Sequence, residues 1–85
     1  MKNVTSVNVY YNGFDRKTDN EIEKALGVEF WASGCEVGTG LRDLAFRVEN
    51  QSQAVSLKEK AFGIKDVHKV TFTDEDGYTV EQFNR

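Results

Sequence analysis

The chain contains one cysteine and one histidine, Cys35 and His68, and a thiol beside an imidazole can form a nucleophilic thiolate and base pair. Such a pair needs a third group that orients the base, and the sequence offers none at a recognisable spacing. The two residues also lack the further cysteine and histidine ligands of a zinc site. A small enzyme using Cys35 and His68 is therefore the weakest alternative. We expect no catalytic residues, no metal and no cofactor.

Two further patterns have structural explanations. The glycine-rich stretch Gly34–Gly40 can offer backbone amides to a phosphate, but phosphate loops lead into a helix, and this stretch leads into an alternating apolar run. We therefore favour a hairpin turn over an anion site. The acidic run Asp74–Asp76 lacks the ligand spacing of a calcium loop. Because Gly77 follows it, the Asp-Gly pair predicts a solvated turn.

Length and composition predict one folded domain over residues 1–85. The chain has 39% hydrophobic and 29% charged residues and a formal net charge of −3, which is typical of ordinary folded proteins. The lone cysteine cannot form an internal disulfide, and residues 1–4 lack the apolar run of a signal peptide. No apolar run approaches the roughly 18 residues of a membrane span. We expect a cytoplasmic protein with no membrane contact.

Hydrophobic periodicity predicts the elements that would position these residues. Alternating patterns predict strands over 4–11, 28–32, 44–48 and 67–73. A capping box from Thr18 to Glu21 predicts the start of a first helix that ends at Gly27, and Asn50 with Gln53 predicts the start of a second that ends at Gly63. The expected inward residues are Ile22, Ala25 and Leu26 in the first helix, Leu44, Phe46 and Val48 in the third strand, Ala54, Leu57, Ala61 and Phe62 in the second helix, and Val70 and Phe72 in the last strand.

This order of elements predicts the fold. Strand, helix, strand, strand, helix, strand is the split βαβ arrangement of an α+β ferredoxin-like sandwich, with an antiparallel sheet and both helices on one face. The segment from Tyr78 to Phe83 adds a possible C-terminal edge strand or hairpin. If it folds back on residues 67–73 it extends the sheet within one chain, and if it crosses to a neighbour it forms a dimer. We favour a homodimer.

The uncovered face of the sheet is the predicted binding surface. The strand periodicity assigns to it Asn8, Tyr10, Trp31, Ala45, Arg47, Lys69 and Thr71. Of these, Tyr10, Trp31, Arg47 and Lys69 are the candidate partner-binding residues, since aromatic residues and arginine are enriched at interface cores. The alternative structural role is that Tyr10 and Trp31 only shield the sheet. A single-stranded nucleic-acid module would also use an open face, but a net charge of −3 gives no basic footprint.

A resemblance supports the fold. The run Ala32-Ser33-Gly34, the run Gly38–Val48 with its Arg42-Asp43 pair, and a helix bearing Ala54 and Ala61 together resemble a loose class of small uncharacterised bacterial and phage proteins. The similarity covers about residues 28–72. The resemblance implies the ferredoxin-like architecture and brings no activity with it. The short length and the lack of an enzyme signature suit a phage accessory protein, which would then act in the host cytoplasm.

The predicted function is a non-enzymatic protein-binding module. It would be a small phage or bacterial regulator or inhibitor that masks the surface of a protein partner. An acidic chain suits a basic partner, because opposite charges speed the encounter. A protein partner is favoured over nucleic acid, and a single-stranded nucleic-acid-binding module that uses the open sheet face is the principal alternative.

Overall fold

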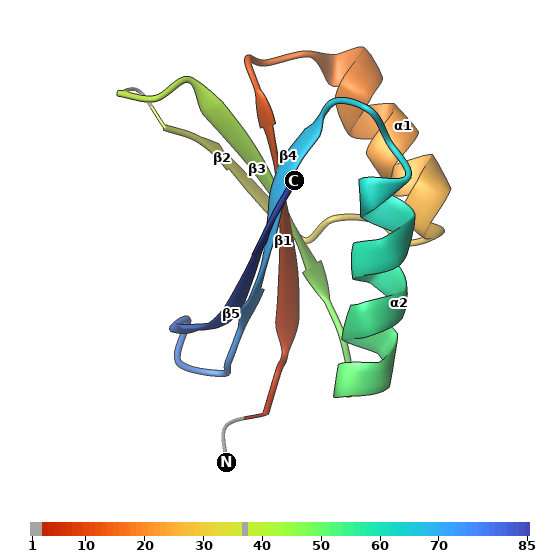
Figure 1. The fold of residues 1–85 in the computed structure, drawn as a ribbon, viewed down its shortest axis with the longest axis vertical. Coiled ribbons are helices and arrows are strands. Elements are labelled where there is room, and N and C mark those ends of the chain that lie inside the picture. The colour runs from red at the N-terminus through yellow and green to blue at the C-terminus, as the bar shows by residue number, and fades with distance from the viewer. Residues whose placement is uncertain (1–2, 37) are drawn as a thin grey trace.

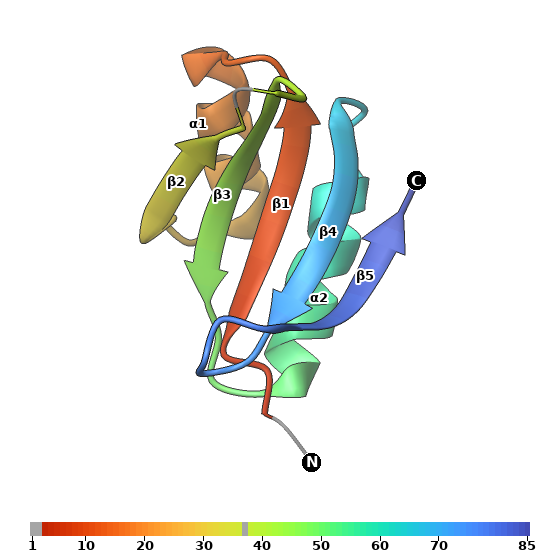
Figure 2. The same cartoon turned by 90° about the vertical axis from the view of Figure 1, so that its left-hand side faces the viewer.

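Five strands form one antiparallel sheet in the computed structural model, which describes residues 3–36 and 38–85 and leaves Met1, Lys2 and Val37 outside the description. The strands are β1 (Ser6–Asn12), β2 (Ala32–Cys35), β3 (Leu41–Arg47), β4 (Val67–Thr73) and β5 (Thr79–Asn84), in the spatial order β2-β3-β1-β4-β5. Helices α1 (Arg16–Leu26) and α2 (Gln51–Phe62) cover one face of the sheet. Figure 1 shows the sheet and helices side by side, and Figure 2 shows the uncovered face of the sheet with the helices behind it. The predicted α+β class is confirmed.

Each helix connects two strands that are separated by one other strand. Helix α1 joins β1 to β2 with β3 between them, and α2 joins β3 to β4 with β1 between them. Because every neighbouring pair is antiparallel, the two strands joined by a helix are parallel to each other. Strand β1 therefore lies at the centre, paired with β3 on one side and β4 on the other.

The core lies between the sheet and the helices. Phe46 is completely buried, and the predicted inward faces of β3, β4 and α2 are confirmed. Ala25 was expected inward on α1 but is exposed, because the inward positions of α1 are Thr18, Asp19, Ile22 and Leu26. The main core side chains are Val7, Val9, Tyr11, Ile22, Leu26, Leu44, Phe46, Ala54, Leu57, Ala61, Val67, Val70 and Phe72.

Helix α1 begins earlier than predicted, so the Thr18–Glu21 capping box is wrong. Its N-cap is Asp15, whose carboxylate accepts from the Lys17 backbone N–H at 2.9 Å. The Thr18 hydroxyl donates back to the same carboxylate. An aspartate at the cap satisfies the free N–H groups of the first turn. The other predicted ends are confirmed: Gly27 caps α1 with φ of +75°, and Asn50 caps α2 by accepting from Gln53.

The second strand begins later than predicted. Residues 28–31 are not a strand, and β2 begins only at Ala32. The backbone N–H of Phe30 donates to the Glu23 carboxylate, and the Phe30 ring packs edge-on against Phe46. These contacts hold residues 28–31 as the connection from α1 to the sheet edge. The hairpin turn therefore lies after Cys35 and ends at Gly40, inside the predicted glycine-rich stretch, of which Val37 lies outside the described residues.

The C-terminal segment folds back within its own chain. Strand β5 pairs with β4 from Lys69–Asn84 to Thr73–Thr79. The turn between them is fixed by Asp74, whose carboxylate accepts from the backbone N–H groups of Asp76 and Tyr78. Of the two alternatives left open by the sequence, the intrachain hairpin is the one observed. No helix in the described ranges is long and apolar enough to span a membrane.

Candidate binding face

The uncovered face of the sheet presents three rows of side chains across the strands. The pairing register aligns Asp43, Tyr10 and Lys69 in one row, Ala45, Asn8 and Thr71 in the next, and Arg47, Ser6 and Thr73 in the third. The middle row is small and polar, and the Asn8 amide donates to the Thr71 hydroxyl at 3.2 Å. The long side chains therefore stand to either side of this row, with Tyr10 and Lys69 on one side and Arg47 on the other.

Two aromatic rings on this face are each covered by a cation. The Arg47 guanidinium lies 4.4 Å from the centroid of the Trp31 ring, and the Lys69 ammonium lies 4.6 Å from the centroid of the Tyr10 ring. Such cation–π contacts hold both partners in place. Neither Arg47 nor Lys69 forms an ion pair with a carboxylate of residues 3–36 or 38–85. Both positive charges remain available to an anionic group from outside.

The face is hollowed beside these pairs. An open depression of about 580 Å³ lies between Trp31 and Arg47 on one side and the β4–β5 turn on the other, where the turn in Figure 1 bends away from the helices. Its lining residues are Thr5, Ser6, Asn8, Tyr10, Trp31, Arg47, Thr73, Asp74, Glu75, Gly77 and Thr79. The Ser6 hydroxyl oxygen is buried there without a hydrogen-bond partner in the described part of the chain. The hollow is therefore polar, with an aromatic wall.

The structure brings three of the four predicted binding residues to one hollow, and the fourth stacks on one of these three. Tyr10, Trp31 and Arg47 line the hollow, and Lys69 packs on Tyr10. Trp31 reaches this face although the strand predicted for it is absent. Its backbone N–H donates to the Ala45 carbonyl at 2.9 Å, which holds it beside β3 just before β2 begins.

The structure does not bring Cys35 and His68 together. Cys35 is on β2 and His68 on β4, and both β3 and β1 lie between these strands. Three interstrand spacings separate the backbones by about 14 Å. Within the described ranges, no three His, Cys, Asp or Glu side chains gather as a metal site. A nucleophile and base pair of Cys35 with His68 is therefore not formed.

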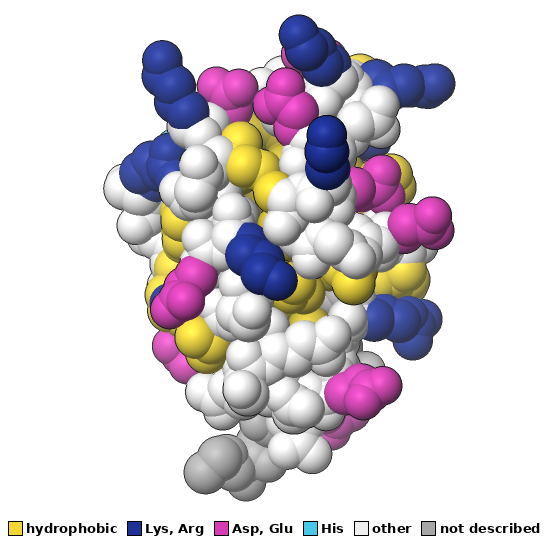
Figure 3. Space-filling model, turned by 90° about the vertical axis from the view of Figure 1, so that its right-hand side faces the viewer, with side chains coloured by type: hydrophobic (Ala, Val, Ile, Leu, Met, Phe, Trp, Pro, Cys, Tyr) yellow, Lys and Arg dark blue, Asp and Glu magenta, His cyan; other side chains and the backbone are white. Residues whose placement is uncertain are grey.

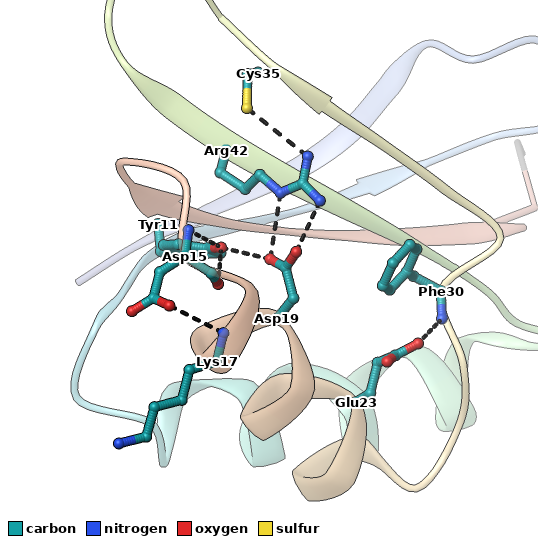
Figure 4. A network of polar contacts seen from close by, with 8 residues as sticks. All are labelled: Tyr11, Asp15, Lys17, Asp19, Glu23, Phe30, Cys35 and Arg42. Atoms are coloured by element: carbon teal, nitrogen blue, oxygen red, sulfur yellow. Dashed lines mark hydrogen bonds and ion pairs between the residues drawn. The ribbon is translucent and has the colours of Figure 1, made fainter.

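A buried polar cluster was missed by the sequence analysis. Figure 4 shows Arg42 of β3 facing Asp19 of α1, with Nη2 and Oδ2 2.8 Å apart and Nε also donating to Asp19. The Tyr11 hydroxyl also contacts the Asp19 carboxylate and accepts from the Asp15 backbone N–H. At its outer edge Arg42 lies 4.3 Å from the centroid of the Phe14 ring and 3.8 Å from the sulfur of Cys35.

The cluster shifts the pKa values of its members. Burial by itself would raise the pKa of Asp19, but hydrogen bonds from Arg42 and Tyr11 and the positive charge of Arg42 hold that pKa below its usual range. Burial, followed by the hydrogen bond to Asp19, raises the pKa of Tyr11. The hydrogen bond to Asp19 raises the pKa of Arg42. Asp19 is therefore ionised and Tyr11 neutral at pH 7.

This cluster fits a structural role. The side chains of Arg42 and Asp19 are only 10% and 7% exposed, and neither residue lines the open depression beside Trp31. The pair ties α1 to β3. One sequence signal pointed to a buried Arg42, namely that it lies in phase with Leu44 and Phe46 on β3. The sequence carried no signal that Asp19 would be its partner.

The chain matches no known protein family, no curated protein and no solved structure. The candidate face is therefore interpreted from its own geometry.

Proposed function

We propose that this protein is a non-enzymatic protein-binding module that masks a partner's surface with the open face of its sheet. The observation that carries the proposal is Trp31. Its side chain is held by Arg47 at the wall of the hollow, yet the residue remains 54% exposed. Tryptophan and arginine are the residue types that most often dominate binding energy at protein interfaces.

The exposed part of Trp31 is large enough to matter for affinity. Burying the remaining surface of a half-exposed tryptophan removes on the order of 100 Å² from water and contributes about 2–3 kcal/mol. Because Arg47 already restrains the ring, little conformational freedom is lost when a partner covers it. The neighbouring hollow can receive a side chain from that partner.

The local charges on the open face define the partner's chemistry more narrowly than the net charge of the whole chain does. The overall balance is −3, but the open face carries two cations, Arg47 and Lys69, that form no ion pair with the described residues. A protein surface that offers an apolar group to Trp31 and a carboxylate to these cations fits this face. Single-stranded nucleic acid fits this face less well, because Asp43 shares a row with Lys69 and Glu75 lines the hollow with Arg47. The opposite, helical face offers no basic patch either, since Figure 3 shows both signs of charge mixed on it.

The proposal includes the architecture and setting expected from the sequence. The split connections of α1 and α2 and the order β2-β3-β1-β4 support a ferredoxin-like sandwich extended by β5 at one edge. A small phage or bacterial regulator acting in the cytoplasm fits a chain of 85 residues with one cysteine.

The test compares Trp31→Ala and Arg47→Ala with Phe14→Ala. Phe14 is a matched control, since it is 59% exposed and also stacks on an arginine, but it lies beside Arg42 away from the open face. Each folded variant, checked by circular dichroism, is immobilised and offered the same cell extract. We expect Phe14→Ala to retain the proteins bound by the wild type and the two open-face variants to lose them.

Identical protein capture by all four proteins would refute the proposal. Binding of single-stranded RNA or DNA oligonucleotides that is lost in Trp31→Ala, with no protein captured, would replace it with the nucleic-acid alternative.

A further inference from the structure

Strand β5 has an unpaired outer edge. The backbone N–H of Arg85 donates to the His68 carbonyl, and the register pairs Phe83 with Val70 and Glu81 with Phe72. Hydrogen-bonded and non-hydrogen-bonded pairs alternate in an antiparallel ladder. The backbone groups of Glu81, Phe83 and Arg85 therefore face β4, and those of the residues between them face outward.

Nothing in the described structure covers this edge. Strand β5 is the last strand of the sheet, and Figure 2 shows no element beyond it. Except for Phe83, its residues are exposed. Natural edge strands are often protected by proline or lysine, and the segment 79–85 has neither. The opposite edge, β2, is only four residues long and contains Gly34. The β5 edge is therefore the better template for another strand.

The charged side chains of β5 also indicate what kind of strand would pair with this edge. The Arg85 guanidinium donates to the carbonyls of Lys65 and Phe62, which are neutral acceptors. It has no carboxylate partner in the described part of the chain, and Glu81, on the same side of β5, has no cation partner there. Two positions to either side of Phe83, the strand thus carries one charge of each sign that has no ion-pair partner among the described residues.

A two-fold axis through Phe83 gives partners both to the outward backbone groups of β5 and to the charged side chains of Glu81 and Arg85. In an antiparallel pairing centred on Phe83, the outward backbone groups of Gln82 meet those of Asn84 from the second strand, and Glu81 stands opposite Arg85. A register centred on Glu81 would place two glutamates opposite each other. A register centred on Gln82 would leave both charges unpaired. Charge therefore selects the Phe83 register.

We propose that the β5 edge pairs with β5 of a second copy of this chain, antiparallel and centred on Phe83. The two five-stranded sheets become one continuous sheet. Contact is made edge to edge, so the open face with Trp31 stays free in each copy. The dimer is therefore independent of the proposed partner binding.

Charge reversal tests the dimer by sedimentation velocity over a range of concentrations. We expect the wild type to dimerise, and Glu81→Arg and Arg85→Glu to weaken the dimer about tenfold each, because two ion pairs become two repulsions. An equimolar mixture of the two variants should form a heterodimer, since the charges are again complementary. Glu59→Arg makes the same charge change on an exposed site of α2 and should leave dimerisation unchanged.

Cysteine crosslinking tests the register. In a Cys35→Ser background, Gln82→Cys and Asn84→Cys should form an intermolecular disulfide when mixed and neither should do so alone. A wild type that stays monomeric, a dimer unaffected by both charge reversals, or a disulfide in Gln82→Cys alone would overturn the proposal. None of these results would bear on whether Trp31 binds a protein partner.

Discussion

Replacing Arg42 with methionine removes one member of the buried ion pair that joins β3 to α1. Methionine keeps the length of the apolar part of the side chain, so the main change is the loss of the guanidinium. The Asp19 side chain, which is only 7% exposed in the wild type, is then left with the Tyr11 hydroxyl as its remaining side-chain hydrogen-bond partner. An uncompensated buried charge is the perturbation that this variant introduces.

The expected loss is large for a small domain. Removing one partner of a buried ion pair costs about 3–5 kcal/mol, whereas the whole free energy of unfolding of a domain is about 5–15 kcal/mol. Arg47→Met provides the matched control on the same strand. Arg47 is exposed and stacks on Trp31, so its replacement should cost at most about 1 kcal/mol. Replacing both charges, in Asp19→Leu with Arg42→Met, should restore most of the stability lost in Arg42→Met.

Urea unfolding followed by circular dichroism, repeated from pH 7 to pH 3, measures these effects. The pKa of Asp19 is lowered in the folded protein, so its contribution to wild-type stability is present above its usual value of 3.8 and is lost as the pH falls through the lower folded pKa. In Arg42→Met the hydrogen bond and the charge of Arg42 no longer oppose burial, so the pKa of Asp19 rises relative to the wild type although the Tyr11 hydrogen bond still lowers it. The defect of this variant should therefore be greatest at pH 7 and shrink as acid protonates the carboxyl.

Two results would refute this reasoning. Equal losses of stability in Arg42→Met and Arg47→Met would mean that the buried pair contributes no more than an exposed arginine. A loss in Arg42→Met that stays constant between pH 7 and pH 4 would mean that the unpaired Asp19 charge is not its cause.

Two further predictions concern the core and the β2–β3 turn. Phe46→Ala should cost about 3–5 kcal/mol in urea unfolding because Phe46 is fully buried, whereas Trp31→Ala should cost about 1 kcal/mol because Trp31 is half exposed. Similar losses for both would place Trp31 in the core and remove it from the binding face. Gly40→Ala should cost about 1 kcal/mol, since Gly40 has φ of +74° and no atom near an added Cβ, and Gly38→Ala in the same turn should have almost no effect on the midpoint of thermal unfolding. An equal effect of the two alanines would rule out backbone strain as the cause.

The sequence by itself was sufficient for the class of fold and the inward faces of most elements. Burial of Leu44, Phe46 and Val48 follows from their alternation with charged residues, since a shift by one residue would bury those charges. The cap at Asn50 and the turn at Asp74–Gly77 likewise follow from local chemistry. These features depend on residues close together in the chain, and such interactions are visible in a sequence.

The sequence was less reliable where a local pattern competed with distant contacts. Thr18 and Glu21 have the form of a capping box, but the helix is capped by Asp15 instead. The backbone N–H of Asp15 donates to the Tyr11 hydroxyl, which holds Asp15 at the start of the helix. The alternation over residues 28–31 resembles a strand, but Phe30 is half-buried and packs edge-on against Phe46 of the core. In both places packing against another element decided between two locally acceptable structures.

Only the tertiary structure decided which side chains meet across the sheet. The sequence identified Tyr10, Trp31, Arg47 and Lys69 as members of one face. The stacking of Lys69 on Tyr10 depends on the register of β1 with β4, and the stacking of Arg47 on Trp31 depends on the backbone bond that holds Trp31 beside β3. The contact of Asp19 with Arg42 spans 23 positions and two kinds of element. No short-range pattern encodes such a contact, because the ion pair forms only after packing has brought α1 against β3 and excluded the water that would otherwise solvate both charges.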